Sequence, residues 1–159
     1  MMQKIHPAQP RRTGGCQCGA IRYAYTGALG APSLCHCRMC QKAFGSFGAA
    51  LLDMTYSEFT WTRGEPSVFR SSSIVSRGFC RDCGTPLFMH DDGDPDIEIA
   101  VGTLDRPDDV PPFRKQSAVE SKLSWFDTLH LLRKERMEDY RSPEDMELLR
   151  SLQHPDHDT

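Results

Sequence analysis

The stretch Gly78-Phe79-Cys80-Arg81-Asp82-Cys83-Gly84 carries two cysteines that are separated by two residues and followed by a glycine. A second stretch, Gly15-Cys16-Gln17-Cys18-Gly19, has a similar pair with one residue between the cysteines. The glycines permit the tight turns that point backbone amides at sulfur. Two such turns supply the four tetrahedral ligands of a structural zinc ion. The sequence therefore predicts a structural zinc site at Cys16, Cys18, Cys80 and Cys83.

A zinc ion at this site would tie the strand that follows the first turn to the hairpins in the middle of the chain. The chain has 159 residues, which is the length of one domain, and its content of large apolar residues is low for a stable core. A metal staple would contribute directly to the free energy of folding. The alternative interpretation is a set of four buried cysteines without a metal.

Three further cysteines, Cys35, Cys37 and Cys40, lie within six residues of one another. Three protein ligands and an open fourth place are typical of a reactive zinc ion. In an extended segment, alternation sends Cys35 and Cys37 to one side and His36 to the other, so we interpret His36 as a packing or second-layer residue. The sequence predicts a second, labile zinc site at the cysteine triplet.

Thiol exchange is the chemistry that this triplet favours. Zinc with three thiolates carries a net negative charge and is a weaker Lewis acid than zinc with three neutral histidines, so metal-hydroxide hydrolysis is not the leading mechanism. A thiol that enters the open place would lose its proton. Arg38 and Lys42 would offset the added negative charge, or they are ordinary solvated surface charges.

Two other interpretations of the triplet are open. An iron–sulfur cluster would use the same residue type, but the triplet lacks the even spacing and the fourth cysteine of a ferredoxin motif. A nucleophilic pair of Cys35 and His36 would require neighbouring side chains that an extended backbone points apart. Zinc is therefore the metal that we carry forward.

The rest of the sequence predicts a mainly β domain with short helical additions near its C-terminus. Alternating apolar residues and turn residues between them predict short strands, and most neighbours are joined as in antiparallel hairpins. The segment from Leu129 onward fits a helix, and Ser142-Pro143-Glu144-Asp145 is a helix start that leads to Leu152. Residues 154–159 are predicted to be a frayed tail. The predicted strands are Ile21–Tyr25, Trp61–Arg63, Ser67–Arg70, Ile74–Phe79, Pro86–His90 and Asp96–Thr103.

Composition and charge exclude several classes of protein. The net charge is −3, whereas nucleic-acid binding requires a concentrated basic surface. The most apolar run, residues 47–52, is much shorter than the roughly 20 residues of a membrane span. We see no export signal, and the seven cysteines are an odd number that cannot be fully paired. A cytoplasmic protein that does not bind membranes or nucleic acid is expected.

The motifs resemble the family of glutathione-dependent formaldehyde-activating enzymes (the GFA family), which also includes centromere protein V. The similarity extends over residues 13–126, and it divides the chain into an N-terminal tail (1–12), a zinc-binding domain (13–126) and a C-terminal helical extension (127–159). Its order and spacing are specific. The motifs that carry it are Gly14–Tyr23, Cys35–Lys42, Phe59–Gly64, Gly78–Leu87, Gly102–Asp105 and Glu120–Phe126.

This resemblance implies an antiparallel β-tent with two zinc ions. It implies that the outer cysteine pairs hold the structural zinc and that the triplet holds the labile one. The activity implied is that of a carbon–sulfur lyase, which joins a small thiol such as glutathione to an aldehyde as S-(hydroxymethyl)glutathione. The alternative is a zinc-binding module of the same fold that binds a partner protein and has no enzymatic activity.

Overall fold

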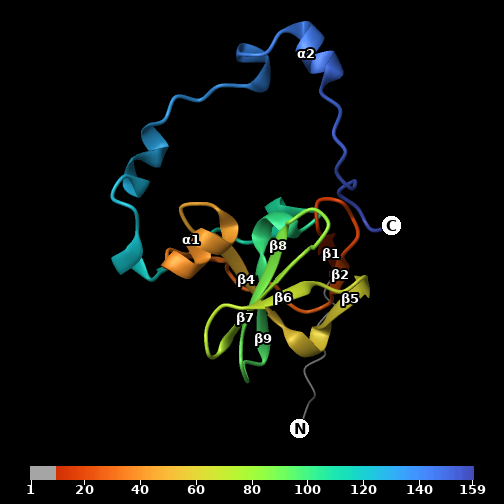
Figure 1. Ribbon diagram of the computed structural model, residues 1–159, viewed down its shortest axis with the longest axis vertical. Coiled ribbons are helices and arrows are strands. Elements are labelled where there is room, and N and C mark those ends of the chain that lie inside the picture. Colours follow the sequence, from red (N-terminus) through yellow and green to blue (C-terminus); the bar gives the residue numbers. More distant parts are fainter. Residues whose placement is uncertain (1–9) are drawn as a thin grey trace, which may run out of the picture.

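Two β-sheets form the body of the computed structural model, which describes residues 10–159 (Figure 1). The smaller sheet has the order β1-β2-β5, and the larger has the order β10-β3-β4-β9-β8-β7-β6. The bounds are β1 Arg12–Gly15, β2 Arg22–Tyr25, β3 Ser33–Cys35, β4 Ala49–Thr55, β5 Phe59–Arg63, β6 Ser67–Arg70, β7 Val75–Phe79, β8 Pro86–Asp91, β9 Asp96–Ala100 and β10 Lys115–Ser117. All paired strands are antiparallel except β10 and β3, which are parallel.

Helices are short and lie outside the sheets. The two α-helices are α1 (Arg38–Phe44) and α2 (Pro143–Leu148). α1 begins directly after Cys37 and ends at Gly45, whose φ of 57° is the left-handed conformation that glycine adopts without a steric cost. Short segments of 3-10 helix, of one or two turns, occur at Tyr56–Glu58, Val101–Thr103, Pro107–Asp109, Val119–Ser121, Phe126–Leu131 and Met137–Asp139.

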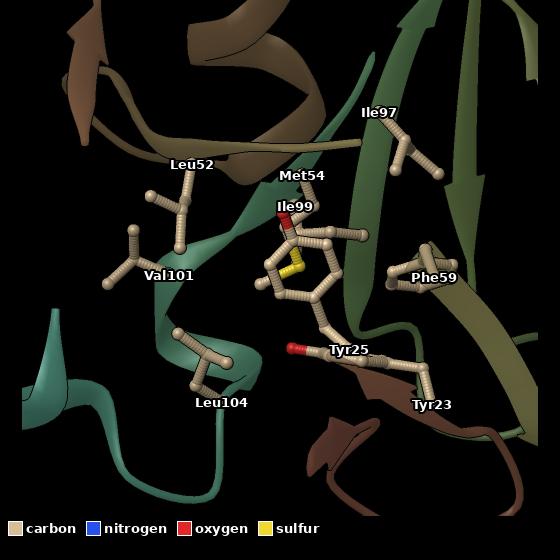
Figure 2. Close-up of a cluster of buried hydrophobic side chains, with 9 residues drawn as sticks. All are labelled: Tyr23, Tyr25, Leu52, Met54, Phe59, Ile97, Ile99, Val101 and Leu104. Atoms are coloured by element: carbon tan, nitrogen blue, oxygen red, sulfur yellow. The ribbon is translucent and has the colours of Figure 1, made fainter. Parts of the chain in front are cut away.

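The main hydrophobic core fills the space between the two sheets (Figure 2). Alternation along β4 points Leu52 and Met54 into this core, and Ile97 and Ile99 of β9 lie beside them. The opposite sheet contributes Tyr23, Tyr25 and Phe59, and Val101 and Leu104 complete the cluster. The same alternation sends Ala49 and Leu51 of β4 to the other face of the larger sheet, where α1 lies. This second face carries the cysteine triplet.

The predicted mainly antiparallel β fold is confirmed, and each predicted strand is present within a few residues of its predicted bounds. Strands β1, β3, β4 and β10 and helix α1 were not predicted. The prediction of a helix from Leu129 onward is wrong, because the chain forms a 3-10 helix over Phe126–Leu131 and then extends. The predicted C-terminal helix is present as α2, although it ends at Leu148 instead of Leu152.

The C-terminal segment leaves the β body and returns to it. Residues 131–141 are exposed, and Figure 1 shows α2 standing away from the sheets. The last residues then bind the body: the His154 amide donates to the Gln17 carbonyl at 2.8 Å, and Arg63 Nη2 donates to the Thr159 carbonyl at 2.6 Å. The prediction of a frayed tail is therefore wrong, because these contacts join residues far apart in sequence.

A buried ion pair fixes the region where this tail binds. Arg22 on β2 donates from Nη1 to Asp105 Oδ1 at 2.9 Å, and Arg22 Nη2 contacts the other carboxylate oxygen. Arg22 Nη2 also donates to the carbonyl of His157 at 3.2 Å. Thr13 of β1 donates to the same carboxylate at 2.5 Å. The pair thus links both sheet β1-β2-β5 and the C-terminal tail to the loop at Asp105.

The predicted division of the chain stays a prediction. Most of the predicted N-terminal tail, residues 1–9, lies outside the described residues, and β1 begins at Arg12. In the part of the chain that the structure describes, no helix has the length and apolar character needed to cross a membrane.

Candidate metal centres

Two hairpin turns bring the first predicted set of cysteines together. Cys16 and Cys18 lie between β1 and β2, and Cys80 and Cys83 lie between β7 and β8. All four Sγ atoms are within 4.8 Å of one another. The Sγ atoms of Cys16 and Cys18 are 3.5 Å apart, and those of Cys18 and Cys80 are 3.8 Å apart. Zinc–sulfur bonds of about 2.3 Å in a tetrahedron give sulfur separations of about 3.8 Å, so this cluster fits one zinc ion.

The backbone of both turns is built in the same way. The Gly19 amide donates to the Cys16 carbonyl at 3.0 Å, and the Gly84 amide donates to the Cys80 carbonyl at 2.9 Å. Both glycines have a φ of 76°, a conformation that other residues rarely adopt. The Ile21 amide points at Cys16 Sγ at 3.2 Å. The glycines that the sequence analysis singled out therefore do allow the turns that direct amides to sulfur.

Hydrogen bonds and burial give the four thiols different acidities. Burial disfavours the thiolate of Cys83, but donors that include the Thr85 hydroxyl lower its pKa to about 6. The Ala20 amide favours the thiolate of Cys18, yet burial and the neighbouring sulfurs raise its pKa to about 12. Without a metal, the cluster therefore holds both thiols and thiolates near neutral pH. Metal binding must release the remaining protons.

The second predicted set of cysteines meets where β3 runs into α1. Cys35 ends β3, Cys37 is the residue that caps α1, and Cys40 lies in the first turn of the helix. The Cys40 amide donates to Cys37 Sγ at 3.3 Å. The three Sγ atoms are within 4.8 Å of one another, with no further His, Cys, Asp or Glu ligand atom of residues 10–159 in the group. Thiolates are soft ligands that suit zinc, so this set also fits a metal ion and leaves a fourth place.

The triplet packs on apolar side chains on one side and is open on the other. Ala49 and Leu51 pack under Cys40, which is fully buried, whereas Cys35 and Cys37 are partly exposed. Burial raises the pKa of Cys40 to about 12. Burial also acts against the thiolate of Cys37, but the amide of Cys40 and the neighbouring sulfurs lower its pKa. A ligand can therefore reach this site from the side of Cys35 and Cys37.

His36 lies between two of these cysteines and does not belong to their group. Its ring is buried, and Nε2 lies 3.0 Å from Gln116 Oε1 on β10. The edge of the ring meets Phe126 with centroids 4.6 Å apart. Gln41 donates from Nε2 to the carbonyls of His36 at 2.6 Å and Ser121 at 2.9 Å. His36 therefore packs against the chain that supports the triplet, which agrees with the interpretation from the sequence.

The charged residue that contacts the triplet is one that the sequence analysis missed. Arg38 and Lys42 are exposed on α1, and Arg38 donates to Gln41 Oε1. Arg77 of β7 is buried, and its Nη2 lies 3.4 Å from Cys40 Sγ. Alternation along the predicted strand places Arg77 on the same face as the buried Val75, and this could have indicated that Arg77 is buried. The contact itself depends on how β7 lies relative to α1.

A separate apolar cavity of about 610 Å³ lies on the other face of the larger sheet. Leu34 and Ala50 line it. They alternate along β3 and β4 with Cys35 and Ala49, which lie on the face of the sheet that carries the triplet. Phe113, which precedes β10, and Phe126 and Leu129, which follow it, cover the cavity. None of the cysteines lines this cavity. It was not predicted from the sequence.

Comparison with known proteins identifies the family. The family model described as glutathione-dependent formaldehyde-activating enzyme matches residues 11–119. The chain belongs to the GFA family. The match includes all seven cysteines and ends short of the predicted domain boundary at residue 126.

A solved structure supports the fold of this GFA-family chain. It is a crystal structure of a Rhodobacter sphaeroides protein determined as a structural genomics target. It aligns with a TM-score of 0.52 and 20% identity, over 66% of this chain and 99% of that one. At this identity the likeness shows the fold alone. A search of the curated proteins finds no match.

Proposed function

We propose that this protein is a zinc-dependent carbon–sulfur lyase of the GFA family, with Cys35, Cys37 and Cys40 as its functional site. The observation that carries the proposal is the arrangement of these three sulfurs, which are within 4.8 Å of one another and lack a fourth protein ligand among the described residues. Membership of the family supports a thiol such as glutathione and an aldehyde such as formaldehyde as the reactants.

The two clusters have different proposed roles. Cys16, Cys18, Cys80 and Cys83 would hold a structural zinc ion, because four thiolates complete its coordination. Cys35, Cys37 and Cys40 would hold the labile zinc ion, which supplies a place where a thiol binds and loses its proton. The bonds from Gln41 and the packing of His36 keep the triplet in place while a ligand exchanges.

The reaction conserves electrons and needs no oxidant. The sulfur of the thiolate attacks the carbonyl carbon of the aldehyde and forms the carbon–sulfur bond. The electron pair of the carbonyl π bond moves to oxygen, which takes up a proton to replace the one that the thiol released. The reverse reaction breaks the same bond. Ala49 and Leu51 pack against Cys40 and keep water from that side of the triplet, so the thiol would enter from the side of Cys35 and Cys37.

The test uses the full chain loaded with zinc. NMR with ¹³C-formaldehyde and glutathione should show exchange between free and adduct forms faster than in buffer. A panel of other aldehydes and thiols defines the substrate. Cys37→Ser should abolish the acceleration. Absence of thiol binding and of acceleration across the panel would refute the enzyme.

A binding module without enzymatic activity is the second candidate, and one observation favours it. The segment after residue 130 exposes large apolar side chains, among them Leu131 (72% exposed), Leu148 (79%) and Leu152 (96%). Clusters of exposed apolar residues are typical of surfaces that bind other proteins. A variant in which these leucines are replaced by serine should keep any thiol-dependent activity if the enzyme proposal is right.

A further inference from the structure

Arg77 is a buried cation that is not paired with a carboxylate among residues 10–159. Its side chain is 5% exposed. Nε donates to Ser71 Oγ at 3.1 Å, Nη2 donates to Cys40 Sγ at 3.4 Å, and Nη1 is buried without a hydrogen-bond partner among the described residues. The other buried arginine for which the structure gives such contacts, Arg22, binds Asp105 through two nitrogens. The two arginines therefore differ in what balances their charge.

Burial of a charge without a partner of opposite sign is very unfavourable. A guanidinium does not escape this cost by losing its proton, because arginine stays protonated in proteins. The group that can balance Arg77 is the sulfur of Cys40, which Arg77 contacts and which would become negative on binding a metal as a thiolate. Three thiolates and one zinc ion would carry one net negative charge, and the charge of Arg77 would cancel it. A bound thiolate substrate would bring the total to one negative charge instead of two.

The region next to Arg77 is also positively charged. A cavity of about 390 Å³ runs along α1 and is lined by Arg77, Arg38, Lys42, Met39 and Phe69. No acidic residue lines it. Its other lining residues are Ala43 and Ser71, and Arg77 connects the cavity to Cys40, so an anionic ligand in the cavity meets cations, apolar side chains and one hydroxyl. The same cations repel a positively charged ligand.

We propose that Arg77 is the counter-cation of the cysteine triplet: it balances the negative charge of the metal-bound sulfurs, and it thereby helps the site to retain its metal and to accept an anionic sulfur ligand. Arg77 is a positioning residue, because it acts through Cys40. The inference rests on the proposed metal site and goes beyond the proposed reaction, since it concerns metal retention whether or not the chain is an enzyme.

The first test measures metal affinity in the full chain loaded with zinc. Arg77→Met keeps most of the side-chain volume and removes the charge, Arg77→Lys keeps the charge, and Arg70→Met removes an exposed charge from the neighbouring strand β6. Competition with a coloured chelator should show a loss of about 10- to 100-fold in affinity at the triplet for Arg77→Met, the range typical of residues that support metal ligands. Arg77→Lys should recover part of this loss. Arg70→Met should match the wild type, and the four-cysteine site should be unchanged in all variants.

A second measurement separates this role from a purely structural one. When a mild chelator has emptied the triplet, Arg77→Met should unfold at the same temperature as the wild type or higher, because an apolar residue removes an uncompensated buried charge. A structural role predicts a lower unfolding temperature instead. Binding of 3-mercaptopropionate to the loaded protein should also be weaker in Arg77→Met than in Arg70→Met.

Three results would overturn the proposal. The first is an unchanged affinity of the triplet for zinc in Arg77→Met. The second is a loss of folding in both Arg77 variants, and the third is an equal loss of metal from both cysteine clusters, because either of these would assign Arg77 to the fold. None of the three bears on whether the wild-type chain joins a thiol to an aldehyde, so failure of this inference and failure of the proposed function are distinguishable.

Discussion

Substitution of Cys80 by Ser should remove most of the stability that the four-cysteine cluster gives to the fold. Zinc at this cluster closes a long loop, because Cys18 and Cys80 are 62 residues apart. The chain entropy of closing a loop of this length corresponds to about 4 kcal/mol at 25 °C, by the relation used for disulfides. This is a large part of the 5 to 15 kcal/mol that is typical of a whole domain.

The expected shift in unfolding temperature follows from this figure. For a chain of this size, each kcal/mol changes Tm by about 2 to 4 °C, so Cys80→Ser should lower Tm by about 8 to 16 °C if the zinc ion is lost. The measurement is thermal unfolding by circular dichroism, with zinc content determined on the same samples. A variant with unchanged Tm and unchanged zinc content would show that this cluster does not staple the fold.

Cys37→Ser is the matched control for this experiment. It removes the same chemical group from the other cluster, whose sulfurs span only residues 35–40 and close no long loop. Its Tm should therefore fall much less than that of Cys80→Ser, while the more easily lost zinc equivalent disappears. If both substitutions lower Tm equally, both clusters are structural and the reasoning about the open triplet is wrong.

Three other predictions follow from the described geometry. A mild chelator, or glutathione in excess, should remove zinc in two phases. The triplet should lose its zinc first because it has an open coordination place, and a single phase on metal analysis would contradict this. Asp105→Asn should destabilise the fold by about 3 to 5 kcal/mol in urea unfolding, since Arg22 would lose its buried partner, whereas Asp109→Asn at an exposed pair should cost less than about 1 kcal/mol. Burial and the Asp53 carboxylate raise the pKa of Glu98 to about 7 from its ordinary value of 4.5, so this group destabilises the fold increasingly as the pH rises through that range. Glu98→Gln should therefore increase Tm more at about pH 8 than at about pH 5.5, and an equal gain at both would refute the assignment.

The cysteine motifs and the strands near them were predictable from the sequence because their signals are local. Spacing and following glycines mark the turns at Cys16–Gly19 and Cys80–Gly84, and turn residues separate β6, β7 and β8. Helix α1 was missed because its cap is a cysteine, which lacks the strong preference of Ser, Thr, Asp or Asn for that position. Strand β10 was missed because three polar or charged residues, Lys115 to Ser117, form a strand only by pairing with β3.

The parts of the site that could not be predicted depend on contacts between distant residues. The position of Arg77 against Cys40 joins residues 37 positions apart. The cavity of about 610 Å³ is formed by β3, β4 and the segment around Phe126 together, so it depends on how these distant segments pack. The docking of the tail joins Arg11 to Asp158, which are 147 positions apart, and no periodic pattern of the sequence encodes such a pair.

The return of the C-terminal residues to the β body has a consequence for handling the protein. The exposed stretch from residue 131 to 152 is connected at both ends to the same body, in one direction through Phe126 and in the other through His154 and Thr159. A protease that cuts at Arg133 or Arg136 would therefore leave a nicked protein whose two pieces remain associated. A tag fused after Thr159 would start beside Arg63 and the first cysteine turn, so a short rigid fusion there would disturb the four-cysteine cluster. An insertion within the exposed stretch would leave both cysteine clusters unchanged.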